Sequence, residues 1–221
     1  MALRDVLDKY ERTLTGEKFL LFDSRPETTS EDEEEVEEEE EQDEGAAAAA
    51  PRRRSPRTLV FATRRNLELL CESGTWFIDG TFKASPIIFT QLFTIMGVRQ
   101  RNTFNGEEVP LPFVYALLSG KTEDEYTAVL RAVRDAVQQY RIRQCTPETI
   151  MSDFELAIIN SCKAVFPDAP LRCCFFHLGQ AVYGHVQSAG LQTLYNDKND
   201  RTIKTDTRML LALAYVPVVH V

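Results

Sequence analysis

Two aspartates stand in apolar, strand-like runs, where their chemistry needs an explanation. Asp79 lies within "WFIDGTFK", and Asp153 ends the run "ETIMSD". A carboxylate in such a run is costly to bury without a compensating partner. Two carboxylates on neighbouring strands can share divalent cations, which would supply that compensation. The pair therefore predicts a metal site. The alternatives are that Asp79 simply ends a strand and that Asp153 caps the following helix.

The elements expected around these aspartates would bring them together. Strand patterns cover 75–83, 89–98, 110–120, 148–154 and 171–177, and helix patterns cover 63–73, 121–141, 155–167 and 178–190. Three strands in a meander, followed by strands that alternate with helices, predict an α/β fold with a mixed five-stranded sheet flanked by helices. The first and fourth strands can pair in parallel, which places Asp79 and Asp153 on neighbouring strands about 4.8 Å apart.

The helix expected over 121–141 has the clearest local signals. Thr122 and Glu125 have the spacing of a capping box. One helical face is apolar, with residues spaced by three and four positions. Its members are Tyr126, Val129, Leu130, Val133, Val137 and Tyr140.

Four stretches carry a resemblance to a known family. They are "FATRRNLELL", "WFIDGTFKASPIIFTQLFTI", "TIMSDFELAIINSCKAVFP" and "CCFFHLGQAV". Their combination resembles the Mutator-like element (MULE) transposase domain, a DDE-type transposase with a ribonuclease H-like fold. The resemblance extends from residue 59 to about residue 217.

The resemblance implies roles for individual residues. Asp79 and Asp153 match the first and second catalytic acids, and Cys174 and His177 match a C-x-x-H motif. The implied cofactor is Mg²⁺ or Mn²⁺, and the implied partner is DNA, both transposon ends and target. In this chemistry of DNA transposition and recombination, one ion activates water and later a DNA 3′-hydroxyl. The other ion stabilises the leaving 3′-oxygen.

The third acid of the family has no evident match. It lies beyond a helical insertion, whereas the last glutamate of this chain is Glu155. We expect Glu155 to favour its helix N-terminus rather than to replace that acid. Asp197, Asp200 and Asp206 follow in a stretch expected to be a loop. A C-terminally truncated domain over 58–221, incomplete or inactive, is therefore one expectation, and whether it is an enzyme stays open. The alternative is a domesticated, non-catalytic module that binds DNA or protein.

Other residues have weaker signals. Lys83, Arg99 and Arg101 could contact phosphate, with solvated surface as the alternative. Zinc needs four ligands, and Cys174 with His177 supplies only two, so the sequence does not favour zinc. A partly buried Cys174 and a hydrogen-bonded His177 are the simpler interpretation. His177 could also orient a phosphate or the carboxylates.

Composition separates the chain into three parts. The net charge of −9 arises from residues 31–44, which hold 12 of the 34 acids, and from residue 45 onward 20 basic residues face 16 acidic ones. A mildly basic domain permits a nucleic-acid partner. Residues 25–57 combine the acidic run with "AAAAA" and "PRRRSPR", which predicts a disordered linker after an N-terminal segment over 1–24. Arg52, Arg53, Arg54 and Arg57 could instead form a nuclear-localisation or phosphate-binding patch.

The remaining features concern the compartment. The N-terminus has no apolar signal-peptide core, and no apolar run has the length of a membrane span. The five cysteines are odd in number, which favours reduced thiols. We therefore expect a nuclear or cytoplasmic protein that is not secreted and has no membrane partner. An oligomer is compatible with the sequence.

Overall fold

The computed structural model describes residues 9–25, 57–104, 107–143 and 145–217, without the side chains of 99–108. The strands are β1 (Leu20–Asp23), β2 (Thr58–Phe61), β3 (Thr75–Thr81), β4 (Gln91–Phe104), β5 (Glu107–Leu118), β6 (Thr149–Ser152) and β7 (Leu171–Cys173). The helices are α3 (Arg64–Cys71), α4 (Glu123–Gln139), α5 (Leu156–Val165), α6 (Phe175–Ser188), α7 (Gln192–Tyr195) and α8 (Thr202–Ala212), followed by the 3₁₀ turn η1 (Leu213–Tyr215).

One mixed sheet organises the fold, in the order β1-β2-β5-β4-β3-β6-β7. Neighbours from β1 to β3 pair antiparallel, whereas β3, β6 and β7 are parallel. The predicted α/β class, the mixed sheet and the parallel pairing of β3 with β6 are confirmed. The sheet has seven strands rather than the expected five. The two additional strands are only four residues long, too short for their alternation to identify them.

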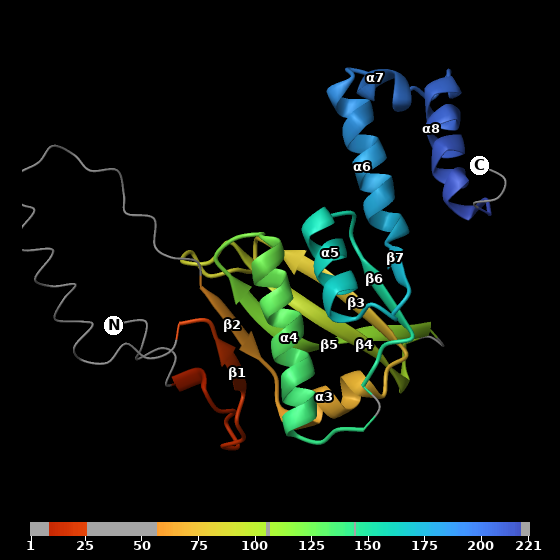
Figure 1. Ribbon diagram of the computed structural model, residues 1–221. Coiled ribbons are helices and arrows are strands. Elements are labelled where there is room, and N and C mark those ends of the chain that lie inside the picture. The colour runs from red at the N-terminus through yellow and green to blue at the C-terminus, as the bar shows by residue number, and fades with distance from the viewer. Residues whose placement is uncertain (1–8, 26–56, 105–106, 144, 218–221) are drawn as a thin grey trace, which may run out of the picture.

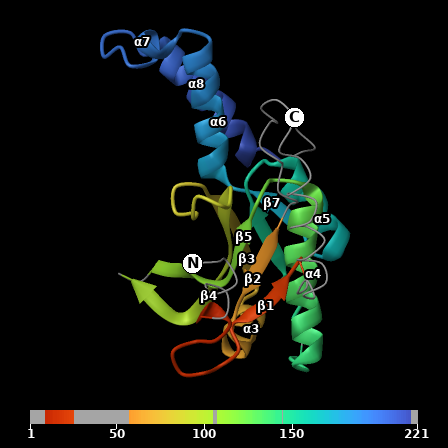
Figure 2. The ribbon, with the colours of Figure 1, turned by 90° about the vertical axis from the view of Figure 1, so that its left-hand side faces the viewer.

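The helices α4 and α5 cover one face of the sheet, as Figure 2 shows. Side chains alternate between the two faces of a strand, so Trp76 and Ile78 of β3 point to the helices and join the main core. The predicted apolar face of α4 packs on them, and the capping box of Thr122 and Glu125 is formed. The opposite face carries a smaller cluster of Leu59, Phe61 and Phe89. β3 is thus anchored in the main core through the face that the helices cover.

Two boundaries differ from the expected ones near the C-terminus. β7 ends at Cys173, and Phe175–His177, expected in the strand, form the first turn of α6. Part of the expected loop after residue 194 is helical, because α8 contains Asp206. A short apolar run does not by itself distinguish a strand from a helix. The helices α6, α7 and α8 form an arm that extends away from the sheet (Figure 1).

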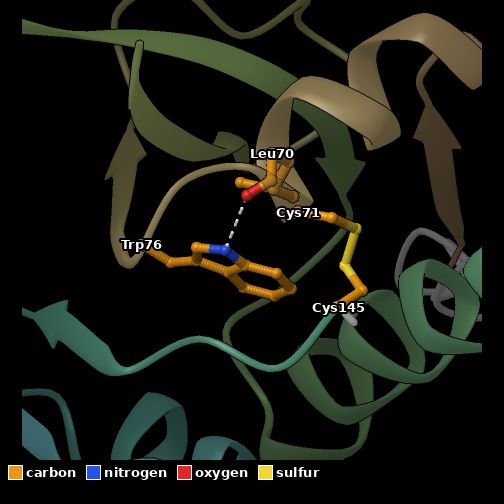
Figure 3. Close-up of a disulfide and its surroundings, with 4 residues drawn as sticks. All are labelled: Leu70, Cys71, Trp76 and Cys145. Atoms are coloured by element: carbon orange, nitrogen blue, oxygen red, sulfur yellow. Dashed lines mark hydrogen bonds between the residues drawn. A yellow bond between two sulfur atoms is a disulfide. The ribbon is translucent and has the colours of Figure 1, made fainter. Parts of the chain in front are cut away.

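A disulfide joins Cys71, at the end of α3, to Cys145, in the segment before β6 (Figure 3). The expectation of reduced thiols is therefore wrong for this pair, because a separation of 74 residues gives no sign of contact in the fold. Beside it, Trp76 is buried and its Nε1 donates a hydrogen bond to the Leu70 carbonyl oxygen at 3.1 Å. Cys162, Cys173 and Cys174 are free.

Residues 26–56, the body of the predicted linker, lie outside the described residues, as do Arg52, Arg53 and Arg54. Arg57 is described, and its guanidinium pairs with Asp23, with 3.0 Å between Nε and Oδ1. The Arg57 guanidinium is therefore engaged in an ion pair beside the sheet, rather than in a basic patch. None of the helices in the described part of the chain is both long enough and apolar enough to cross a membrane.

Candidate metal and nucleic-acid site

Asp79 occupies the second half of β3, opposite Thr94 of β4. Strand alternation turns its side chain to the face opposite Ile78, and 41% of that side chain is exposed. Oδ1 accepts a hydrogen bond from the Gly80 N–H at 2.9 Å. The carboxylate is therefore oriented by the backbone and accessible from outside.

Asp153 directly follows β6, at the turn into α5. Its Oδ1 accepts a hydrogen bond from the Glu155 N–H at 3.0 Å. The helix cap itself is Glu155 rather than Asp153, so the sequence alternative of Asp153 as the N-cap is wrong by two residues. The side chain of Asp153 instead stabilises the turn before the cap.

The register of β3 and β6 places the two aspartates at equivalent positions. Thr75 pairs with Thr149 and Phe77 with Met151. Continued by two residues, this register leads from Phe77 to Asp79 within β3, and from Met151 to Asp153, the first residue after β6. Parallel strands have their carboxyl ends at the same edge, so both carboxylates belong to one end of the sheet.

The C-x-x-H segment lies at the same edge. Cys174 is the N-cap of α6, and its N–H donates to the Ser152 carbonyl oxygen at 2.7 Å. His177 Nε2 lies 4.0 Å from Asp79 Oδ1, which is longer than a hydrogen bond. Within the described part of the chain, the buried Nδ1 of His177 has no hydrogen-bond partner. His177 therefore neighbours the Asp79 carboxylate without being bonded to it.

The neighbouring Cys173 also lies near this edge. Its partial burial raises the pKa of the thiol above the ordinary value, and the negative charge of Asp153 adds to that rise. Cys173 therefore remains a thiol near neutral pH.

Three polar side chains also lie next to the site, and the sequence analysis assigned none of them to it. Gln91 of β4, Tyr126 of α4 and Glu155 form a continuous hydrogen-bonded chain. Gln91 Nε2 lies 2.8 Å from the Tyr126 hydroxyl, which lies 3.0 Å from Glu155 Oε1. One sequence signal for Gln91 was available. Gln91, Phe93 and Ile95 are alternate residues of an apolar strand, so all three side chains face the core.

The expected phosphate contacts separate into two groups. Lys83 is exposed in the loop after β3, four residues beyond Asp79. Arg99 and Arg101 belong to β4 beyond Gly97, which pairs with Trp76. They lie roughly 17 Å and 24 Å along the strand from Thr94, the partner of Asp79. These two arginines are therefore remote from the aspartates, because the antiparallel pairing carries them toward the other end of β3.

A cation that was not expected lies nearer. Lys121 Nζ stands 3.8 Å from the centroid of the Phe82 ring, in a cation–π contact. Phe82 follows β3 directly, and both side chains are exposed. Lys121 and Lys83 therefore place positive charge close to the end of β3 that carries Asp79.

The donor atoms suit a hard divalent ion. Carboxylate oxygens are the ligands that Mg²⁺ and Mn²⁺ prefer, and the Asp79 side chain is partly exposed and so accessible to an ion. Among the described residues, no three His, Cys, Asp or Glu side chains lie close enough to form a complete metal-binding group. The two aspartates fit an ion that completes its coordination with water or substrate oxygens.

We expect Gly80→Ala to disturb this edge. A Cβ on Gly80 would lie 2.5 Å from Gln91 Oε1, and Gln91 is held by two hydrogen bonds from its Nε2. Overpacking of this kind costs about 1–3 kcal/mol in the free energy of unfolding, measurable by urea denaturation. Gly179→Ala, with nothing within 4 Å of the added Cβ, is the control. Equal stability of the two variants would contradict the packing of Gln91 on Gly80.

The fold and the paired carboxylates define an α/β domain with a candidate divalent-metal site. Residues 75–181, which include Asp79, Asp153, Cys174 and His177, match the family model of the MULE transposase domain. This segment belongs to that family, and the chain thus contains a Mutator-like element transposase domain, as the sequence resemblance predicted. No curated protein and no solved structure matches the chain.

Proposed function

We propose that residues 75–181 form the metal-binding part of a DNA transposase active site. Asp79 and Asp153 would hold Mg²⁺ or Mn²⁺, and the substrate would be DNA. The observation that carries the proposal is the parallel register of β3 and β6, which gives the two aspartates equivalent positions within the matched segment. The strands β5-β4-β3-β6-β7, three antiparallel and then parallel, support a ribonuclease H-like fold.

The residues of this chain have distinct parts in the proposed function. A bound divalent ion would polarise a phosphate oxygen and neutralise charge that develops in phosphoryl transfer. Asp79 and Asp153 provide the negative charge that attracts the ion, each with one oxygen oriented by a backbone N–H. Lys83 would contact a DNA phosphate beside the site. His177 would orient a phosphate oxygen or water next to Asp79.

We further propose that this 221-residue chain binds the ion without cutting DNA. No glutamate follows Glu155 in the sequence. Asp206 lies in α8, within the arm that extends from the sheet, so it does not replace the third acid. A misplaced reacting group can cost about 10²-fold in rate, and an absent acid would cost at least as much.

The second candidate is a non-catalytic module that binds DNA or protein. The observation that favours it is the exposed apolar surface of the arm, including Leu210, Leu213 and Tyr215. Clustered apolar surface of this kind is typical of interaction sites. The two candidates differ in whether the aspartates bind a metal ion.

Titration of Mn²⁺ by calorimetry tests the proposal. We expect weak binding by the wild-type chain and about 10-fold or greater loss in Asp79→Ala and in Asp153→Ala, since each removes a charged ligand. Asp168→Ala is the matched control, because Asp168 is exposed in the loop before β7, at the opposite end of that strand. Mn²⁺ binding that neither active-site substitution changes would defeat the metal role.

Incubation with supercoiled DNA and Mn²⁺ tests the activity separately. We expect no nicking by wild type. Nicking by wild type that both aspartate substitutions abolish would contradict the proposed inactivity and establish an enzyme. Nicking that survives both substitutions would identify a different site or a contaminating nuclease.

A further inference from the structure

The hydrogen-bonded chain of Gln91, Tyr126 and Glu155 has a fixed direction. Gln91 Nε2 lies 3.0 Å from the Gly120 carbonyl oxygen and 2.8 Å from the Tyr126 hydroxyl. A carbonyl oxygen can only accept, so the nitrogen of the Gln91 amide must be on this side, where its two protons serve both partners. The Tyr126 hydroxyl then accepts from Gln91 and has its own proton to donate to Glu155 Oε1, at 3.0 Å.

The chain is rigid because its two inner members are enclosed. Tyr126 is 0% exposed and Gln91 is 1% exposed. The Tyr126 ring packs against Phe93, with 5.1 Å between ring centroids. Burial raises the pKa of Tyr126 well above its ordinary value, so the hydroxyl keeps its proton near neutral pH. Inside a protein, such satisfied networks strengthen one another and specify one arrangement.

Both proposed metal-binding aspartates are linked to this chain, Asp153 directly and Asp79 through its neighbour Gly80. The Glu155 N–H donates to Asp153 Oδ1 at 3.0 Å, so the residue whose side chain Tyr126 holds also orients the Asp153 carboxylate. Gly80, next to Asp79, packs against Gln91, because an added Cβ would come within 2.5 Å of Gln91 Oε1. The chain therefore links the turn after β6 to the end of β3 through the interior.

We propose that Gln91 and Tyr126 are positioning residues that hold the Asp153–Glu155 turn in register with Asp79 and so set the affinity of the site for its divalent ion. This inference rests on the proposed function, since it assumes that the two aspartates bind the ion. Glu155 acts as the anchor of the turn, and its carboxylate is engaged by Tyr126. Hydrogen-bond partners of metal ligands typically contribute about 10–100-fold in metal affinity.

The test is Mn²⁺ titration of single variants, each with its thermal unfolding followed by circular dichroism. Tyr126→Phe removes only the hydroxyl and should weaken Mn²⁺ binding about 10-fold. Glu155→Ala should weaken it to the same extent. Glu155→Gln keeps an oxygen that accepts from Tyr126 and should stay within about threefold of wild type, which a direct ligand would not.

The matched control is Tyr115→Phe. It also removes one tyrosine hydroxyl, here bonded to the Pro112 carbonyl oxygen at 3.4 Å, and should leave Mn²⁺ binding unchanged. The double variant Tyr126→Phe/Glu155→Ala should bind Mn²⁺ no more weakly than Glu155→Ala alone, because both substitutions remove the same hydrogen bond between Tyr126 and Glu155. If Tyr126→Phe does not fold, the comparison of Glu155→Ala with Glu155→Gln decides, since the Glu155 side chain is not fully buried.

Three results would overturn the inference, and they differ in what they leave standing. Unchanged binding in Tyr126→Phe, together with loss in Asp79→Ala, would refute the positioning role and leave the proposed function intact. Equal loss in Glu155→Gln and Glu155→Ala would show that the Glu155 carboxylate contacts the ion itself. Unchanged binding in Asp79→Ala would overturn the metal site and the positioning role with it.

Discussion

Reduction of the Cys71–Cys145 disulfide is expected to lower the free energy of unfolding by about 4 kcal/mol. The bond closes a loop with a sequence separation of 74 residues, and loop-closure entropy for that length gives this magnitude. The loop contains β3, β4, β5 and α4, so the bond restrains most of the core. Urea unfolding of the wild-type chain with and without a phosphine reductant measures the difference.

The double variant Cys71→Ala/Cys145→Ala provides the control for this prediction. It should match the reduced wild type in stability and should not respond to reductant. A response in the double variant would assign the effect to Cys162, Cys173 or Cys174, which are free in the structure. Equal stability of oxidised and reduced wild type would contradict a stabilising disulfide.

Trp76→Ala is expected to cost about 3–5 kcal/mol, the range for truncation of a large aromatic side chain in a core. Trp76 is 1% exposed, and its ring meets Phe166 edge-on, with 5.3 Å between ring centroids. Its indole N–H also satisfies the Leu70 carbonyl oxygen at the end of α3. The variant therefore loses packing between the sheet and α5 as well as one buried hydrogen bond.

Two further variants separate these contributions. Trp76→Phe keeps an aromatic ring but removes the indole donor. The Leu70 carbonyl oxygen still accepts from the Ser73 N–H at 3.0 Å, so the lost hydrogen bond should cost about 0.5–1.5 kcal/mol. Ile87→Ala, fully exposed in the loop after β3, should change stability by less than about 0.5 kcal/mol. Urea unfolding followed by far-ultraviolet circular dichroism gives all three values. A Trp76→Ala cost no larger than that of Ile87→Ala would contradict the core position of Trp76.

The parts of the fold that sequence could predict are those with a long periodic pattern. Helix α4 has both a capping box and an apolar face from Tyr126 to Val137, and both are present as predicted. The parallel pairing of β3 and β6 followed from the order of the elements. For β1 the only sign was the strand-like run "KFLLF" of residues 18–22, and β2 had none, because four residues are too few to show alternation. Their partners are fixed by contacts far along the chain, such as that between Arg57 and Asp23.

The candidate site was predictable only in part. Asp79 and Asp153 are visible as charges in apolar runs, and the family match covers them. The positions of Arg99 and Arg101 relative to the aspartates were not predictable, because the sequence does not show which end of β3 the far part of β4 reaches. The hydrogen bond between Gln91 and Tyr126 joins residues that are 35 positions apart in the sequence. Without knowledge of strand register, no local pattern indicates that a buried amide and a buried phenol meet.

The direction of α6 has a consequence for how the arm and the site can move relative to each other. α6 contains 14 residues, and at 1.5 Å per residue it is about 20 Å long. A rotation of about 10° around Cys174 would carry the far end of α6 through roughly 3–4 Å, while His177, about 4–5 Å from that pivot, would shift by less than about 1 Å. A small rotation at the start of α6 would therefore displace the far end of the arm by several times more than it would displace His177, which would stay beside Asp79.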